Sequence, residues 1–327
     1  MSEQKRKTAL VVLYNHNFEK NIPVIRKIYG NRFSQTVQIM PFYYGSDDDV
    51  IRVYGNSFQF HTYIAQARER LKELDCDDFL IVGDDLLLHP SFNEWSTGEI
   101  LNLKPGAFYI DGFVNVARDG YYRAVKEACN FCTSPAGVDA SANRILPSYE
   151  KAEQILRERG ILDSVNLQKV RPYMAPFVRP ISQNLYKNYK VLRARAWHLR
   201  YSFKNKLAKR KMSYPCVFGY SDLISVPRER FDEWCNYLEI FATWRMFVEL
   251  AIPTAMALLP NAEIVCADST GKQTGNVWFP QDGAHRAKME SIIARMLKES
   301  DNCADGLADA YPDDYLYLHP VKLSKMK

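Results

Sequence analysis

Two adjacent aspartates, Asp84 and Asp85, follow an apolar run and are the strongest candidates for chemistry in the sequence. The stretch FLIVGDDLLLHP places four apolar residues before Gly83 and three leucines after the acid pair. Burying an unpaired carboxylate is costly, so two of them in an apolar run indicate a bound cation or a strand end that reaches a cleft. A structural alternative is that the two side chains cap a turn or the following helix.

A hydrophobic–GDD–hydrophobic run also marks the metal-binding hairpin of template-directed polymerases, which is a second alternative. Polymerases of that class need another metal-binding aspartate and a fingers region well upstream of the motif. Here only 82 residues precede Gly83, and they show the pattern of alternating strands and helices. The order of the elements therefore argues against a polymerase.

The elements that must position the acid pair are visible in the periodicity of the apolar residues. Residues 8–13, TALVVL, form a continuous apolar run that is typical of a strand buried on both faces. The same criteria predict a helix, a strand, a helix and a strand over 18–33, 36–44, 58–74 and 78–85. This alternation predicts an α/β fold with a parallel sheet. Farther along we expect strands near 106–117 and 217–227, a helix over 149–160, and one or two apolar helices over 228–259.

Polar residues follow each of the first three predicted strands. Tyr14 and Asn15 follow the first strand, the loop GSDDDV follows the second, and Asp84 and Asp85 end the third. Because ligands of open α/β sheets bind beyond the carboxyl ends of the strands, we expect these groups to share one edge. The three aspartates 47–49 have no apolar flank to fix them, so we interpret them as a solvated turn.

An acidic pair at the end of the third or fourth strand of an N-terminal α/β half resembles the DxD-type motif of GT-A glycosyltransferases. The resemblance is one of pattern and covers roughly residues 8–90 and 217–258. The sequence departs from the strict motif, because Leu86 stands where a third-position aspartate is expected. The resemblance implies a GT-A-like, Rossmann-like, mostly parallel sheet with flanking helices. We divide the chain into a catalytic domain at 1–285, with a basic insertion at about 164–213, and a helical C-terminal tail at 286–327.

The same resemblance implies a metal-assisted transfer from a nucleotide-sugar, and we expect a UDP-sugar. Mn²⁺ or Mg²⁺ on carboxylates would neutralise the diphosphate leaving group. Asp85 and Asp84 are the expected metal ligands, or Asp84 instead contacts the ribose or a bound water. Some GT-A enzymes complete the metal site with a C-terminal histidine, and His285 is our candidate for it. The expected contacts of the nucleotide are Tyr14, Asn15, Asn56 and Asp84.

Inverting transfer needs a carboxylate that takes the proton from the acceptor hydroxyl. Glu249 lies in an apolar helical pattern ahead of Pro253, where burial would raise its pKa toward that of a useful base. A structural alternative pairs Glu249 with Arg245, four residues earlier. Asp222 competes for the role, because it lies at a predicted strand where an acceptor could dock.

The charge of the chain is concentrated in one segment. Residues 164–221 contain 13 Lys and Arg and no Asp or Glu, whereas the whole chain carries a formal charge of only +5. This segment could gather an anionic or lipid-linked glycan acceptor, or lie on the inner face of a membrane as a peripheral contact. A solvated face is the structural alternative. We expect no nucleic-acid partner for a glycosyltransferase. The rival hypothesis is a non-catalytic protein that binds nucleic acid or a membrane surface through this segment.

The cysteines and the apolar runs predict a cytoplasmic protein. Seven cysteines without framework spacing indicate reduced thiols, and the single CxxC pair at 129–132 lacks the second pair that a structural zinc site needs. The longest apolar stretch, 240–260, is interrupted by Arg245, Glu249 and Pro253, so we predict no membrane span. We interpret the N-terminal apolar run as the first strand and not as a signal peptide.

Overall fold

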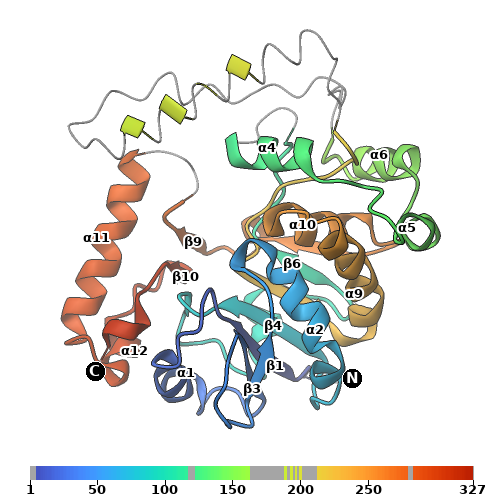
Figure 1. Cartoon of the computed structure of the whole chain (residues 1–327). Helices are drawn as coiled ribbons and strands as arrows, with labels where there is room; N and C mark the ends of the chain where they lie inside the picture. The colour runs from blue at the N-terminus through green and yellow to red at the C-terminus, as the bar shows by residue number, and fades with distance from the viewer. Residues whose placement is uncertain are drawn as a thin grey trace. The chain divides into compact units, whose positions relative to one another are not determined.

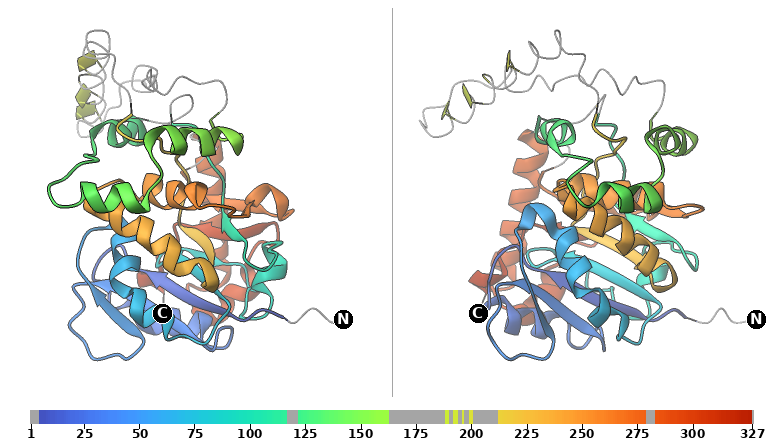
Figure 2. Two further views of the ribbon diagram at one scale, coloured as in Figure 1. Left: turned by 90° about the vertical axis from the view of Figure 1, so that its right-hand side faces the viewer. Right: turned by 45° about the vertical axis from the view of Figure 1, so that its right-hand side comes forward.

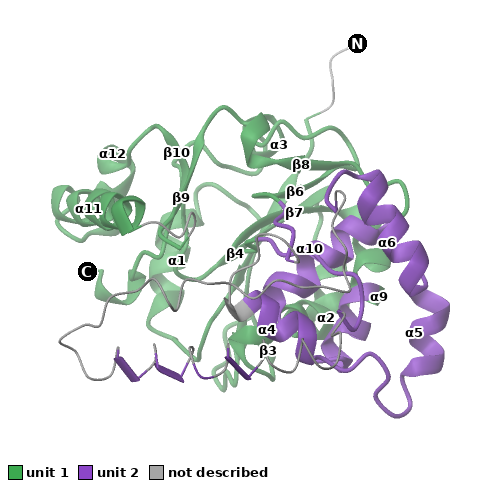
Figure 3. Ribbon diagram, turned by 90° about the horizontal axis from the view of Figure 1, so that it is seen from above, with its two compact units in different colours: residues 1–112, 220–236, 260–327 green, residues 113–219, 237–259 purple. Residues whose placement is uncertain are grey.

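The fold consists of two compact units, each built from separate stretches of the chain (Figure 3). The computed structural model describes residues 5–116, 122–162, 188–189, 192–193, 196, 199–200, 212–278 and 283–326. The first unit comprises 1–112, 220–236 and 260–327, and the second comprises 113–219 and 237–259. This division differs from the predicted boundary at residue 285. Most of the predicted basic insertion lies outside the described residues.

The first unit contains a seven-stranded sheet with the order β3-β2-β1-β4-β7-β6-β8. Strand β7 runs antiparallel to both of its neighbours, and the other pairs are parallel. The predicted fold class, a mostly parallel α/β sheet with flanking helices, is confirmed (Figure 1). The strands are β1 Thr8–Leu13, β2 Thr36–Pro41, β3 Val50–Val53, β4 Asp78–Gly83, β6 Phe108–Ile110, β7 Leu223–Pro227 and β8 Ile264–Cys266.

Strands β1 and β4 are buried along their whole length, as the continuous apolar runs predict. Alternate side chains therefore enter two different layers. On one face, Leu10 and Val82 join a core with helices α1 (Asn21–Tyr29) and α11 (Gly283–Glu299). On the other face, Phe79 contacts Phe231 of helix α9 (Arg228–Thr243), with 4.5 Å between ring centroids. Helix α2 (Phe60–Lys72) is joined to α9 by an ion pair between Arg68 and Asp232.

A second, three-stranded sheet in the first unit has the order β5-β10-β9. Its central strand β10 (Tyr315–His319) is antiparallel to β5 (Leu87–Leu88) and parallel to β9 (Gln273–Asn276). The predicted helical tail at 286–327 therefore contains strand β10 in addition to most of helix α11. The strand was missed because its pairing partners lie far away in sequence. Helix α1 and the segment after α11 lie side by side, although they are distant along the chain (Figures 1 and 2).

The second unit is helical in its described part. Helix α10 (Val248–Leu258) is buried at every position except Glu249, which is half-buried. The other helices of this unit are α4 Tyr122–Asn130, α5 Asp139–Ile145 and α6 Tyr149–Glu158. Two further short helices belong to the first unit, α3 Thr97–Ile100 and α12 Leu307–Ala310. None of the described helices is long and apolar enough to cross a membrane.

The close approach of β9 to β10 depends on a glycine. A Cβ atom added at Gly275 would stand 2.0 Å from the main-chain oxygen of Tyr317, so Gly275→Ala must push the strands apart. We expect a loss of stability of about 1–3 kcal/mol, typical of overpacking, measured as a lower thermal midpoint. Gly98→Ala is the matched control, because nothing lies within 4 Å of its added Cβ. Equal midpoints for the two variants would contradict this account of the pairing.

Candidate functional site

Asp84 is buried at the edge of the sheet, where it forms hydrogen bonds with neighbouring segments. Its main-chain N–H donates to the Leu13 carbonyl at 2.8 Å. Its carboxylate accepts hydrogen bonds from the Asn15 main-chain N–H at 3.2 Å and from Asn21 Nδ2 at 2.9 Å. Burial, and next the charge of Asp85, raise the pKa of Asp84 to about 7. Asp84 therefore ties the end of β4 to the end of β1 and to the start of α1.

Asp85 is more exposed than Asp84, with 29% of its side chain accessible, and it contacts the C-terminal part of the chain. Its Oδ1 lies 3.2 Å from Nε2 of His319. Its main-chain carbonyl accepts a hydrogen bond from the N–H of Val321 at 2.6 Å. Both the side chain and the main chain of Asp85 are thus held by the residues at and after the end of β10.

Asp222 and His319 complete a small polar cluster with Asp85. Asp222 immediately precedes β7, whose amino end lies beside the carboxyl end of β4 because the two strands are antiparallel. The Gly83 N–H donates to the Asp222 carbonyl at 3.1 Å. The His319 Nδ1 is 3.6 Å from Asp222 Oδ2, so the imidazole lies between the two carboxylates. Burial raises the pKa of Asp222, and the nearby His319 opposes this shift.

A fourth carboxylate, Asp111, belongs to the same edge and was missed by the sequence interpretation. It follows β6 directly and accepts hydrogen bonds from the phenols of Tyr317 and, at 3.3 Å, Tyr109. Burial is the main cause that raises the pKa of Asp111 to about 7, and the charge of Asp222 adds to it. The only signal in the sequence is a single aspartate at the end of a predicted strand, which many structural residues share.

The described residues contain no group of three or more His, Cys, Asp or Glu side chains arranged to hold a metal ion. Asp84 turns its carboxylate toward Asn15 and Asn21. His285 lies in the first turn of α11, and its Nε2 is 2.8 Å from the main-chain oxygen of Asn276. Their metal roles stay predictions. Asp85 and Asp222 do offer hard oxygen donors, and Mg²⁺ often uses only one or two carboxylates with substrate phosphates. The donor chemistry therefore fits a divalent cation brought by a diphosphate.

The residues predicted to contact a nucleotide have other partners in this structure. Tyr14 is fully buried, and its hydroxyl donates to Gln38 Oε1 at 2.5 Å. Asn15 contributes its main-chain N–H to Asp84. Asn56 is exposed and caps a short 3₁₀ turn, because its Oδ1 accepts the Phe58 N–H at 3.1 Å. A direct contact with a nucleotide stays a prediction for all three.

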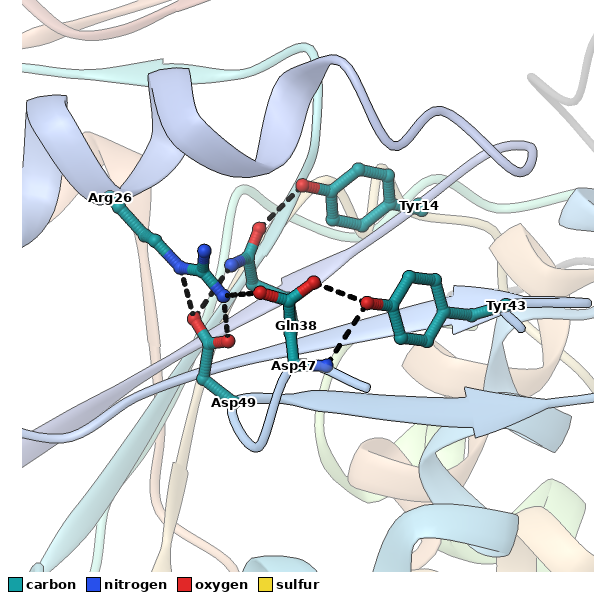
Figure 4. Close-up of polar contacts among 6 residues, drawn as sticks. All are labelled: Tyr14, Arg26, Gln38, Tyr43, Asp47 and Asp49. Atoms are coloured by element: carbon teal, nitrogen blue, oxygen red, sulfur yellow. Dashed lines mark hydrogen bonds and ion pairs between the residues drawn. The ribbon is translucent and has the colours of Figure 1, made fainter. Parts of the chain in front are cut away.

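A polar network connects Tyr14 to the loop after β2 (Figure 4). Gln38 Nε2 donates to Asp49 at 2.9 Å, and the Arg26 guanidinium pairs with both Asp49 and Asp47. The interpretation of 47–49 as a solvated turn holds for Asp48, which is exposed, but not for its neighbours. Hydrogen bonds to Tyr43 and Arg26 lower the pKa of Asp47, so it remains ionised and holds the loop in place.

Glu249 belongs to the second unit, in the first turn of α10. Pro253 lies inside this helix and has no N–H to donate to the carbonyl four residues earlier. The Gly219 N–H donates to that Glu249 carbonyl instead, at 3.0 Å. Arg245 lies outside the helix with a φ of 53°, so the proposed four-residue helical pair is not formed within one helix. The catalytic role of Glu249 stays a prediction.

Comparisons with known proteins add little to these observations. No protein-family profile matches the sequence, and no curated protein matches it. Among solved structures, an active-site mutant of LgtC, a glycosyltransferase of the GT-A type, has 12% identity and a TM-score of 0.21. The match covers 72% of this chain and 95% of that one. A TM-score this low supports no conclusion about the fold or the function of this chain. The sheet itself is seven-stranded and mostly parallel, with flanking helices.

The raised pKa of Asp84 makes stability depend on pH. Its folded pKa of about 7 exceeds the value of about 4 in an unfolded chain, so the folded state holds this proton more tightly. The resulting stabilisation is fully present below about pH 4 and is lost as the pH rises through about 7. Asp84→Asn should flatten this decline and raise the thermal midpoint above pH 7 in buffer that contains a chelator. Asn21 can rotate its amide to accept the added N–H, because its Oδ1 has no partner among the described residues.

The control for this measurement is Asp48→Asn, which changes an exposed carboxylate in the loop after β2. Its pH profile should follow that of the wild type. A profile for Asp84→Asn that declines as steeply as the wild type would show that Asp84 does not titrate in this range.

Proposed function

We propose that the chain is a glycosyltransferase that moves a sugar from a nucleoside-diphosphate sugar to a glycan or glycolipid acceptor. The observation that carries this proposal is the meeting of Asp85, Asp222 and His319 at the carboxyl end of β4. These residues come from three different strands or their ends, and they gather carboxylates at the edge where open α/β sheets bind ligands.

Asp85 and Asp222 are the residues that would hold Mn²⁺ or Mg²⁺. When bound, the cation would neutralise the charge that develops on the diphosphate as the sugar–oxygen bond breaks. His319 lies between the two carboxylates and orients both of them. Asp84 holds the end of β4 next to the loop after β1 and the start of α1, by accepting hydrogen bonds from Asn15 and Asn21.

Three carboxylates compete for the role of general base, and Asp222 can take it only if Asp85 holds the cation without it. Asp222 and Glu249 were expected from the sequence, and Asp111 is added by its place beside Asp222. A base works best when its pKa lies near the working pH, which the pKa of about 7 for Asp111 satisfies. The phenols of Tyr109 and Tyr317 orient the Asp111 carboxylate. Asp111 is therefore our first choice for an inverting transfer.

The substrates follow from the same proposal. We propose a UDP-sugar as donor and an anionic or lipid-linked glycan as acceptor, which the basic residues of 164–221 would attract. A peripheral position on the inner face of a membrane would bring such an acceptor to the enzyme. Most of this basic segment lies outside the described residues, so its role rests on the sequence alone.

The cation site predicts the behaviour of Asp85→Asn. This change removes a charged oxygen donor and keeps the shape, so it should weaken Mn²⁺-dependent binding of UDP roughly tenfold or more. Isothermal titration with and without MnCl₂ measures the effect. Asp48→Asn should bind as the wild type does. If Asp85→Asn bound UDP with wild-type affinity, the Asp85 carboxylate would not be part of the cation site.

The choice of base predicts a separation between binding and turnover. Of the variants Asp111→Asn, Asp222→Asn and Glu249→Gln, the one that removes the base should lose about 10²-fold or more in kcat with little change in donor KM. Initial rates of sugar transfer with a saturating acceptor measure both quantities. Losses below about tenfold in all three variants would contradict a carboxylate base at these positions.

A further inference from the structure

An aromatic rim surrounds the loops that follow β1, β2 and β3. Among the described residues, five of the eight exposed aromatic side chains lie between residues 18 and 58. Single exposed apolar residues are normal on protein surfaces, whereas several on adjoining loops mark a binding surface. The strands are parallel, so their carboxyl ends place these loops at one edge. We call the set the aromatic rim, made of Phe18, Phe42, Tyr44, Tyr54 and Phe58.

The main chain of Phe42 is strained and is fixed by two hydrogen bonds, and its side chain is exposed. Its φ of 55° lies in the left-handed region, which bulky side chains rarely adopt. The Phe42 N–H donates to the Val53 carbonyl at 3.0 Å, and Asn17 Nδ2 donates to the Phe42 carbonyl at 2.8 Å. Strain of this kind persists where the surrounding contacts enforce it, and it occurs most often at functional sites. The ring is nevertheless 46% exposed.

Tyr54 is fixed in the same manner by a different side chain. The Gln66 amide accepts the Tyr54 N–H at 2.9 Å and donates to the Tyr54 carbonyl at 2.7 Å. The rings of Phe42 and Tyr54 meet edge to face, with 5.8 Å between centroids. The two rings thus form a platform that is about half exposed and held by hydrogen bonds of its main chain, so binding a ligand there costs little additional order.

The charges around the rim are mixed in sign, so no strong field favours a charged ligand over a neutral one. Asp48 is exposed, and Asp47 and Asp49 are already paired with Arg26 (Figure 4). Arg52 lies over the ring of Tyr44, at 5.5 Å from its centroid. A polyphosphate backbone or an anionic lipid surface would meet the Asp48 carboxylate as well as the Arg52 guanidinium, whereas the binding of a neutral sugar depends on neither charge. Carboxylate, guanidinium and amide groups beside open rings can bind the hydroxyls of a sugar whose C–H face stacks on the ring.

We propose that the aromatic rim is a binding site for the neutral sugar rings of a glycan, with Phe42 and Tyr54 as its platform. The site needs neither a cation nor a nucleotide, so it goes beyond the proposed transfer reaction. If that reaction is correct, the rim would hold part of a glycan substrate near the strand ends. The rim would then contribute to the choice of glycan and not to the chemical step.

The test uses the full chain in buffer with EDTA, which removes any dependence on the cation site. Cellohexaose, maltohexaose and chitohexaose serve as probes, and binding is followed by chemical shifts of the aromatic side chains. We expect at least one probe to shift resonances of the rim, and Tyr54→Ala to weaken that binding about tenfold. Phe42→Gly, which also relieves the left-handed strain, should weaken it similarly while the protein stays folded.

Trp95→Ala is the matched control, because Trp95 is as exposed as Phe42 but lies at the other end of β1, where the Thr8 N–H donates to Glu94. It should bind the probe as the wild type does. No shift with any of the three probes, or equal binding by Tyr54→Ala, would overturn the proposal. The proposal would also be overturned if uridine or phosphatidylcholine vesicles, and not the sugars, changed the chemical shifts of the rim. The ligand would then be a nucleobase or a lipid surface and not a glycan. Asp85→Asn should retain sugar binding, which separates this result from a failure of the proposed transfer.

Discussion

A buried carboxylate at the end of β4 fixes the geometry of the whole sheet edge. Asp84 accepts hydrogen bonds from the loop after β1 and from the start of α1, while its own N–H is paired with Leu13. A buried carboxylate is tolerated only where such partners satisfy it. The next residue, Asp85, faces the end of β10 instead. The two aspartates of one motif therefore have different tasks, one internal and one directed at the site.

The second sheet brings the remaining polar groups to this edge. Strand β10 supplies Tyr317 and His319, two residues apart and so on the same side of the strand. One contacts Asp111 and the other lies between Asp85 and Asp222, which links all three carboxylates to a single strand. A change in the pairing of β10 with β9 would move both contacts together. The close approach at Gly275 consequently has a direct bearing on the candidate site.

The sequence predicted β1, β2 and β4 well, because β1 and β4 are buried on both faces and the helices between them have a clear apolar stripe. It did not predict the short edge strand β3, which is only four residues long. The acid pair was also placed at the correct edge. Strand β10 was missed, because its partners β5 and β9 lie far from it in sequence and leave no local pattern. For that reason His285 was chosen from the sequence and His319 was overlooked. The different orientations of Asp84 and Asp85 depend on Asn21, which no periodicity reveals.

The interleaving of the two units has a consequence for synthesis on the ribosome. Strands β1 to β4 can pair with one another as soon as they emerge, because β1 pairs with β2 and β4, and β2 with β3, within the first 83 residues. The free edge of β4 must then wait for β7, while more than one hundred residues of the second unit are made. Asp85 and His319 are separated by 234 positions, so the candidate site closes only after nearly all of the described chain has left the ribosome. An unpaired central strand with an apolar surface is a target for chaperones and for aggregation during that interval.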